Sequence, residues 1–577
     1  MSHRSSFAFT LLISLPWLPS CGGAPARPAA PVADAVELIA QPFPSRAALE
    51  AILAEPIPVF PASIDAVPVA EWTLKGPLPT TPLGAETDEG DWTKVARAFA
   101  ETRGGALVLS PALRCTAREI ASFFATKGGM PTESVQDFIA ARCGWPYTLS
   151  SHGVLTATFK KAGTDAALLT AFKKHVDEGL ASLVPNEPGT IGLAVERHED
   201  RVVAVWVVGQ PRAALSEPLT ADASGVVHVR GKFLGAGDRA RALMNGDGFS
   251  VHVCAAEPVA PPSFSFRCEG ASTAGEPRWL TLVAHAPGQL IGRAVINTMV
   301  ATSDASLTWH APPAPSTAAL GAPAAIGETI LPPLNELRAA LGEPPLRLAH
   351  EQAALNARLV PYVFSASTTN PARMEQISLG VLAGWDVKGG LVRDATLELL
   401  TSHATTAGDW LAEALTQPMG RLVLLDPRAE EIALGAYAVP GKSLVATVTS
   451  SYSFFHGETH PEIADALAAR LLAERRAHGL PDVQRIAGLA GIDAATRDIA
   501  AGKDPNASLM GALQDATARV GRSFRGLALR TIDPTVTPLP PVLAASKVPT
   551  FAVAVGHHAA AGSAWGEYVI LWLWPAE

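Results

Sequence analysis

A pattern that recurs along the chain limits its possible folds more than any other feature of the sequence. An Arg is followed four residues later by a Gly and four residues after that by an apolar residue, at Arg338, Gly342, Leu346 and again at Arg475, Gly479, Val483. Residues 99–108 keep part of the pattern. It is typical of an amphipathic helix that ends at a glycine, after which the chain turns into a second helix. Because each copy later reads as a pair of strands, the sequence predicts three related modules.

The repeat divides the chain into segments of different character. We predict modules over residues 91–210, 327–456 and 460–577, the last of them shortened. Residues 211–312 hold short strand-like runs separated by Gly, Pro and Asp, which predicts a small β-sandwich. Residues 22–90 are rich in Pro and Ala and predict a tether followed by an irregular segment.

The second copy resembles a known family. Its opening, from Leu334 to Leu346, and its closing stretch, from Trp410 to Gly435, are similar to bacterial CAP domains, the SCP or PR-1-like superfamily. The resemblance implies an α+β fold in which each module is an α-β-α sandwich. It extends more weakly over the other two copies. We therefore predict tandem, degenerate CAP-like sandwiches, up to three, with an inserted small β-sandwich.

The sequence departs from the family at the residues that line the CAP cavity. CAP domains often carry two His and two Glu there, sometimes with a divalent metal. The family's Pro-Gly-His-Arg position reads Pro418-Met419-Gly420-Arg421 here, without the His, and the segment before it lacks the family's Gly-Glu-Asn. We therefore carry over the fold and no functional residue, and we predict no catalytic, cofactor-binding or metal-ligating residue and no cofactor.

The N-terminus predicts export. A basic start is followed by a short apolar run, too short to span a bilayer, and then by Leu18-Pro19-Ser20-Cys21-Gly22. This resembles the lipobox of bacterial lipoproteins, which implies a signal peptide over residues 1–21 and a lipid on Cys21. Gly22 favours the outer membrane or cell surface. The alternatives are ordinary secretion, with Cys21 as a chance thiol, and a cytoplasmic protein.

The other cysteines are four in number: Cys115, Cys143, Cys254 and Cys268. An even number in an exported chain predicts two disulfides, and proximity along the chain favours Cys115 with Cys143 and Cys254 with Cys268. The alternative is four buried thiols. None of them has the spacing of a zinc site.

Composition excludes some classes of function. The formal net charge is −9 and there is no long basic run, so nucleic acid is not an expected partner. With 48% hydrophobic residues the chain can form cores of ordinary size. After the N-terminus, no stretch is long and apolar enough for a transmembrane helix.

Several groups of residues in the sequence could form a functional site. His350-Glu351 begins like a zinc-protease motif but lacks its second His. His557-His558 follow a strand, where neighbours point to opposite faces and bind one metal poorly. The aromatic residues of 565–574 fit a strand buried on both faces better than a ligand groove. A hydrolase would need distant residues to converge, such as His403 with Glu413 or His152 with His198.

The function predicted from the sequence is therefore non-enzymatic. We expect a lipoprotein of the cell envelope, held to the membrane through its lipid, that binds or scaffolds an extracytoplasmic protein or a small hydrophobic ligand. The hydrophobic ligand rests on analogy with CAP relatives that bind sterols or lipids. The alternatives are an extracytoplasmic hydrolase that uses a non-standard CAP cavity, and an inert structural spacer.

Overall fold

The fold was analysed in a computed structural model of the chain. It describes residues 35–37, 43–60, 66–74, 90–102, 107–158, 170, 173–176, 178, 189–217, 219–222, 224–235, 237, 239–270, 278–285, 292–300, 307–311, 316–456, 459–531, 534, 537–545, 547–559 and 564–576. Cys21, the predicted signal peptide and the Pro/Ala-rich start of the tether lie outside the described residues. No helix in the described part of the chain is long and apolar enough to cross a membrane.

The chain forms two compact units, which are treated separately here. The C-terminal unit contains β1 (Ala35–Glu37) together with Glu458–His558 and Tyr568–Glu577, and the larger unit contains Ala40–Gly457 and Ala559–Glu567. The larger unit holds two helix-and-sheet modules and a β-sandwich. The C-terminal unit holds a third module.

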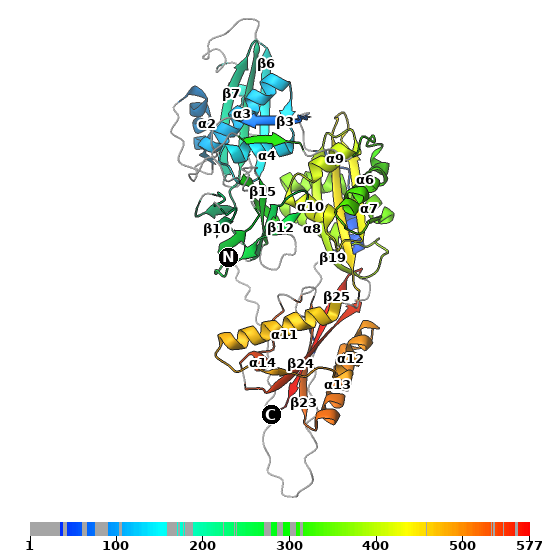
Figure 1. The fold of residues 1–577 in the computed structure, drawn as a ribbon. Coiled ribbons are helices and arrows are strands. Elements are labelled where there is room, and N and C mark those ends of the chain that lie inside the picture. Colours follow the sequence, from blue (N-terminus) through cyan, green and yellow to red (C-terminus); the bar gives the residue numbers. More distant parts are fainter. Residues whose placement is uncertain are drawn as a thin grey trace. The chain divides into compact units, whose positions relative to one another are not determined.

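Module 1 is a sheet with helices on both faces (Figure 1). Its strands are β4 (Leu107–Leu109), β6 (Leu149–Thr158), β7 (Gly189–His198) and β8 (Arg201–Gly209), and its helices are α2 (Asp91–Thr102), α3 (Pro111–Lys127) and α4 (Glu133–Arg142). Strand β8 is apolar throughout because both its faces are covered: Val202 and Ala204 pack in one core with α2, and Val203 and Val205 pack in another with α3 and α4.

Module 2 repeats this arrangement. Its strands are β18 (Arg347–Leu348), β19 (Val392–Ser402), β20 (Glu431–Ala438) and β21 (Val445–Phe454), and its helices are α6 (Ile326–Ala340), α7 (His350–Thr369), α8 (Pro371–Leu382), α9 (Ala407–Ala414) and α10 (Pro418–Leu425), with the short 3-10 turn η1 (Pro323–Ala325) before α6. Helices α6, α9 and α10 share one core with β20, and α7 and α8 share another with β21.

Module 3 is the C-terminal unit. Its strands are β1, β22 (Gln484–Arg485), β23 (Phe524–Thr531), β24 (Thr550–Ala559) and β25 (Gly566–Pro575), and its helices are α11 (His460–Ala477), α12 (Ala490–Ala500), α13 (Pro505–Val520) and α14 (Pro541–Ala545). Helices α12 and α13 cover one face of the sheet, and α11 with α14 covers the other (Figure 1). The aromatic residues of β25 are buried on both faces, Trp572 completely, which accords with the core interpretation rather than a groove.

The three sheets share one strand order, which is the structural counterpart of the repeat in the sequence. In each, a short strand pairs in parallel with the first strand of a hairpin, and the second hairpin strand pairs antiparallel with a long strand. The orders are β4-β7-β8-β6, β18-β20-β21-β19 and β22-β24-β25-β23, the last extended by β1. The chain is therefore of the α+β class, with three α-β-α layered modules.

The repeated arginine is a structural clamp. Arg338 and Arg475 are fully buried, and each donates through Nε to the carbonyl oxygen six residues ahead, on Pro344 and Pro481. Each also donates through Nη1 to the carbonyl of a distant leucine in its own module, Leu424 or Leu543. A guanidinium has five donors in a fixed fork, so one side chain can hold a turn and a neighbouring segment together. This explains the spacing seen in the sequence.

A glycine in the first hairpin strand lets a helix approach the sheet closely. A Cβ on Gly192 would lie 2.0 Å from the backbone of Leu113 in α3, and one on Gly435 would lie 2.1 Å from the backbone of Ala357 in α7. In module 3 a Cβ on Gly556 would lie 3.0 Å from the carbonyl oxygen of Thr496 in α12. Backbone contacts this short leave no room for a side chain.

The β-sandwich joins two four-stranded antiparallel sheets. One sheet contains β9 (Ala213–Leu215), β10 (Val227–Phe233), β13 (Ala255–Ala256) and β14 (Ser263–Cys268), and the other contains β11 (Arg239–Asn245), β12 (Val251–Val253), β15 (Arg278–His285) and β16 (Arg293–Val300). The strand β17 (Leu307–His310), which the predicted boundary placed inside the sandwich, pairs instead with β3 (Glu71–Leu74).

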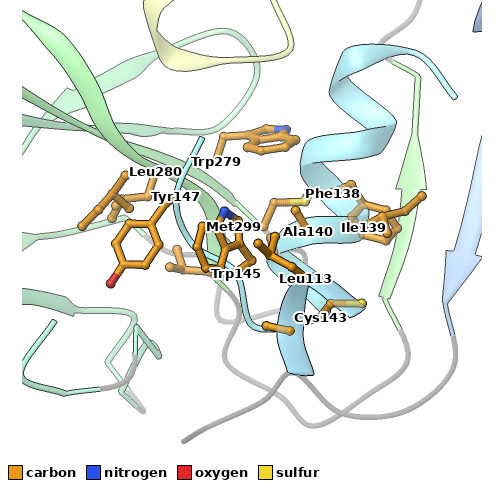
Figure 2. Close-up of a cluster of buried hydrophobic side chains, with 14 of the residues drawn as sticks. Leu113, Phe138, Ile139, Ala140, Cys143, Trp145, Tyr147, Trp279, Leu280 and Met299 are labelled. Carbon is orange, nitrogen blue, oxygen red and sulfur yellow. The ribbon is translucent and has the colours of Figure 1, made fainter. Parts of the chain in front are cut away.

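The core of the sandwich continues into module 1. Figure 2 shows Trp145 and Tyr147, which follow α4, beside Trp279, Leu280 and Met299 of the sandwich. All five belong to one cluster of buried apolar residues. The Trp145 and Tyr147 rings meet edge to face with their centroids 5.2 Å apart. Because the two share one core, the sandwich and module 1 form a continuous body.

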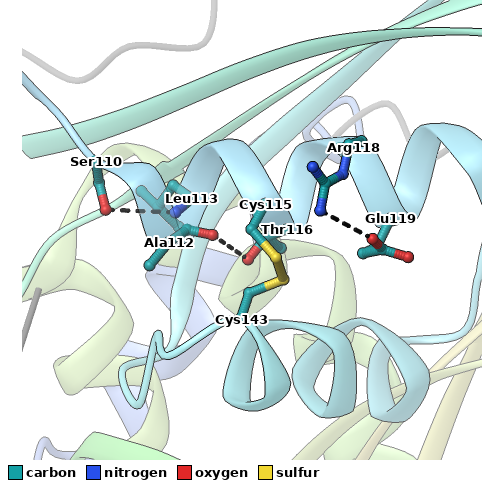
Figure 3. The surroundings of a disulfide bond; sticks show 8 residues. All are labelled: Ser110, Ala112, Leu113, Cys115, Thr116, Arg118, Glu119 and Cys143. Carbon is teal, nitrogen blue, oxygen red and sulfur yellow. Dashed lines mark hydrogen bonds and ion pairs between the residues drawn. A yellow bond between two sulfur atoms is a disulfide. The ribbon is translucent and has the colours of Figure 1, made fainter. Parts of the chain in front are cut away.

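Two disulfides pair the cysteines that are neighbours along the chain. Cys115 of α3 bonds Cys143 at the end of α4 (Figure 3), and Cys254 bonds Cys268 at the end of β14. These are the pairings that sequence proximity favours. The first lies one turn after the Ser110 cap, whose hydroxyl accepts the Leu113 N–H at the start of α3. It ties the two helices that cover one face of module 1.

Residues 43–60 and 66–74 differ from the irregular segment that composition suggests. Helix α1 (Arg46–Leu53) packs its apolar Leu49 and Ile52 against α7 and α8 of module 2. The short strand β2 (Ala66–Val67) pairs with β5 (Met130–Pro131), and β3 pairs with β17. A few apolar residues at helical or alternating spacing are enough for such elements once a larger body offers a surface to pack on.

Candidate functional site

Polar side chains gather where module 1, the sandwich and module 2 meet. Four carboxyl groups lie there: Glu133 and Asp137 on α4, Glu398 on β19 and Glu413 on α9. We call them the junction carboxylates. Glu133 is exposed and the other three are half-buried. Because they come from two modules, the fold rather than the local sequence brings them together.

Asp137 connects three parts of the larger unit. Its Oδ2 accepts a hydrogen bond from Asn297 Nδ2 of β16 at 2.9 Å and from Gln417 Nε2, just before α10, at 2.8 Å. Asn297 also donates its backbone N–H to the Pro146 carbonyl, at 2.9 Å. One carboxyl group thus joins module 1, the sandwich and module 2.

The other junction carboxylates differ in their partners. Glu413 accepts from the Ser402 hydroxyl, and Glu133 accepts from the Thr401 hydroxyl at 3.4 Å. Within the described residues, the buried Oε2 of Glu398 has no hydrogen-bond partner. The other oxygen of Glu398, Oε1, would be 2.4 Å from a Cβ on Gly420, so the missing side chain at Gly420 makes room for it.

Burial and mutual repulsion keep protons on this cluster. Desolvation, followed by the charge of Glu133, raises the pKa of Asp137 and of Glu398 to about 8. Desolvation also raises the pKa of Glu413 to about 7, although the Ser402 hydrogen bond opposes the shift. Glu133 itself is exposed, so water screens its charge more effectively. At neutral pH Asp137 and Glu398 are therefore largely protonated, and Glu413 is about half protonated.

Arg421 fixes the neighbouring contact between module 2 and the sandwich. Its Nε donates to the Leu415 carbonyl at 2.8 Å, and its Nη1 donates to the carbonyls of Gly248 and Ser250 at 3.1 and 3.3 Å. The guanidinium also lies 5.5 Å from the centre of the Phe249 ring. Burial, with the nearby Arg278, lowers the pKa of Arg421 to about 10. Asn245 adds a hydrogen bond to the Thr416 carbonyl at 2.8 Å.

These groups can hold protons and join modules. Protonated carboxyl groups could also act as general acids if a substrate reached them. Among the residues the structure describes, no group of three or more His, Cys, Asp or Glu side chains is arranged to hold a metal ion.

The histidine pairs considered from the sequence are not assembled into one site. His403 receives the Ala66 N–H on Nε2 at 3.4 Å, whereas Glu413 accepts from Ser402. His152 lies opposite Val207 on β8 and His198 opposite Arg201, so about 20 Å of strand separates them.

The remaining sequence candidates are not among the junction carboxylates. His350 and Glu351 start α7 at the surface, where Glu351 pairs with Lys388. His557 faces His460 at the start of α11, a partner 97 residues away in the sequence. His557 and His558 are consecutive residues of β24, so their side chains alternate between the faces of the sheet.

Sequence reasoning missed three of the four junction carboxylates. Glu133 and Asp137 are spaced as on a solvated helix face, which carries no signal of burial. Glu398 offered a weak signal, because it interrupts the apolar run Leu397 to Leu400 in a strand. Only Glu413 was considered, and then with His403.

Comparisons with known proteins add little to this geometry. No protein-family model matches the chain, and no curated protein does so either. Among solved structures, the chain aligns with the "Crystal Structure of Na-ASP-1", a CAP-domain protein, at 8% identity and a TM-score of 0.16, over 64% of this chain and 94% of that chain. A TM-score this low supports no conclusion about fold or function.

Proposed function

We propose that the chain is an exported, lipid-anchored protein of the cell envelope that acts without catalysis. In this proposal degenerate CAP-like modules and a β-sandwich form a scaffold that binds an extracytoplasmic partner or ligand. The family assignment rests on the sequence resemblance in module 2 and is supported by the α-β-α layering that recurs in each module.

One observation carries the scaffold role. The stretch Gln417 to Arg421, which stands where CAP domains place a cavity histidine, holds modules together here. Gln417 donates to Asp137, Gly420 makes room for Glu398, and Arg421 binds carbonyls of the sandwich. The polar groups of these residues are used in contacts within the protein and not in binding or converting a substrate. These contacts favour a structural role.

Lipid anchoring is tested by metabolic labelling with an alkyne fatty acid. The natural chain and Cys21→Ala would be expressed in a bacterial host and their membranes fractionated. We expect the natural chain to carry label and to sediment with membranes, and Cys21→Ala to lose both. Absence of label in the natural chain would refute the anchor.

The absence of catalysis is tested with generic ester and peptide substrates. The purified full chain would be compared with Glu398→Gln and with the matched surface control Glu474→Gln. No turnover by any of the three supports the scaffold, whereas equal turnover by all three would overturn it without placing the catalytic site at the junction. Turnover that Glu398→Gln abolishes and Glu474→Gln retains would overturn it and favour a hydrolase.

A further inference from the structure

Two histidines of module 3 face each other, one at the start of its first helix and the other near the end of a strand. His460 is the first residue of α11, and His557 lies near the end of β24. Nδ1 of His557 is 3.4 Å from Nε2 of His460, and the ring centroids are 5.2 Å apart. Both side chains are half-buried. The pair lies wholly within the C-terminal unit, whereas the junction carboxylates belong to the larger unit.

Strand alternation fixes the direction of His557. Ala552 and Ala554 of β24 pack in the core shared with α12 and α13. Residues one position away, including Phe551 and His557, therefore point to the opposite face, where α11 lies. Phe551 contacts Trp572 on that face, with the ring centroids 5.9 Å apart. His558, the next residue, points away from His460.

The separation of the two nitrogens is long for a hydrogen bond and also matches that of two ligands on one metal ion. Hydrogen bonds from N–H donors are usually about 2.7–3.2 Å long. Two imidazole nitrogens bound to one Zn²⁺ at about 2.0–2.1 Å, at the tetrahedral angle, are about 3.3–3.4 Å apart. A square-planar or octahedral ion would bring them to about 2.8–3.0 Å. The observed 3.4 Å matches the tetrahedral case.

We propose that His460 and His557 form a two-histidine site for a tetrahedral divalent metal ion, Zn²⁺, whose remaining positions are filled by water or a small anion. Imidazole nitrogen is a preferred ligand of Zn²⁺. Water in an open coordination position is also a feature of many zinc sites. The proposal is independent of the proposed scaffold role, because it uses no residue of the junction.

Both imidazoles are in the form that binds metal. Desolvation and the proximity of His557 lower the pKa of His460 to about 4, and desolvation lowers the pKa of His557. Neutral imidazole carries the lone pair that a metal needs, so no proton has to be removed at pH 7 before binding.

The test is zinc binding by the purified full chain, expressed without a histidine tag and treated with chelator. Titration with ZnCl₂, followed by calorimetry, should show one site per chain. His460→Ala and His557→Ala should each lose it. His478→Ala and His558→Ala should keep the site. His478 is exposed and follows the last turn of the same helix, and His558 lies on the opposite face of the same strand.

Geometry and folding are checked separately. Co²⁺ bound in place of zinc should give the intense visible absorption of a tetrahedral complex. His460→Gln and His557→Asn keep polar side chains, and circular dichroism reports whether each variant is folded. Any of three results would overturn the proposal: no zinc site in the natural chain, unchanged zinc binding by folded His460 and His557 variants, or an octahedral cobalt spectrum.

Discussion

Replacing Asp137 with Asn should remove much of the pH dependence of the contact between modules 1 and 2. Burial raises the pKa of Asp137 from 3.8 to about 8, so the docked state holds a proton that the opened state releases. Docking is therefore fully stabilised below about pH 4 and weakens as the pH rises toward 8. The asparagine side chain has the shape of the protonated aspartic acid and can still accept from Asn297 and Gln417, without ever becoming charged.

The magnitude follows from the two pKa values. A single group shifted from 3.8 to about 8 would cost about 3.6 kcal/mol between pH 5 and pH 8. Asp137 is only half-buried, so water screens part of this cost, and we expect about 1–2 kcal/mol. Opening of the junction should then become about 5–30-fold more frequent over this range.

Hydrogen exchange measures this opening directly. Peptides covering β16 and α10 would be followed by mass spectrometry at pH 5 and pH 8, with the rates corrected for intrinsic exchange. The natural chain should lose protection as the pH rises, and Asp137→Asn should lose clearly less. The remaining slope belongs to Glu133, Glu398 and Glu413. Asp91→Asn, an exposed carboxylate of module 1, is the control. Parallel loss in the natural chain and Asp137→Asn would refute the reasoning.

Other substitutions test other parts of the fold. Cys115→Ser opens a cross-link over 28 residues, which should cost module 1 about 3.5 kcal/mol of stability in urea unfolding. Unfolding of Cys115→Ser at the same urea concentration as the oxidised natural protein would contradict this. Gly435→Ala should lower the melting temperature strongly because its Cβ meets α7 backbone, whereas Gly511→Ala, an open helical position, should gain about 1 kcal/mol. The lysine side chain of Arg421→Lys cannot donate to the same set of carbonyls. The contact should therefore lose about 1–3 kcal/mol of stability, and hydrogen exchange of the backbone amides in residues 245–250 should become faster.

Local patterns were sufficient to predict the α+β class. The hairpin strands and the Arg-to-Gly spacing are set by residues close together in the sequence, and their burial follows from the apolar pattern. The role of Arg338 could not be predicted in the same way, because its partner Leu424 lies 86 residues away. A charged residue in a repeated motif looks the same in sequence whether it is solvated or buried as a clamp.

The junction was hidden for a related reason. Its carboxyl groups come from α4, β19 and α9, and the two partners of Asp137 lie 160 and 280 residues away in the chain. The spacing of Glu133 and Asp137 predicts a solvated helix face, and α4 does leave Glu133 exposed. Only the docking of module 2 surrounds Asp137. Contacts between modules depend on surfaces that the periodicity of one module does not describe.

The repeat also bears on how a scaffold can arise from such modules. Each α-β-α module satisfies its own sheet and covers both faces, so its stability does not depend on residues at its rim. Positions at the rim can therefore differ from one module to the next. In module 2 the rim holds Gly420, which leaves room for a carboxyl group, and Arg421, which binds the sandwich. In module 3 the rim holds the His460 and His557 pair instead. Because the core and the rim are separable, one fold can serve as a joint in one copy and offer a ligand site in another.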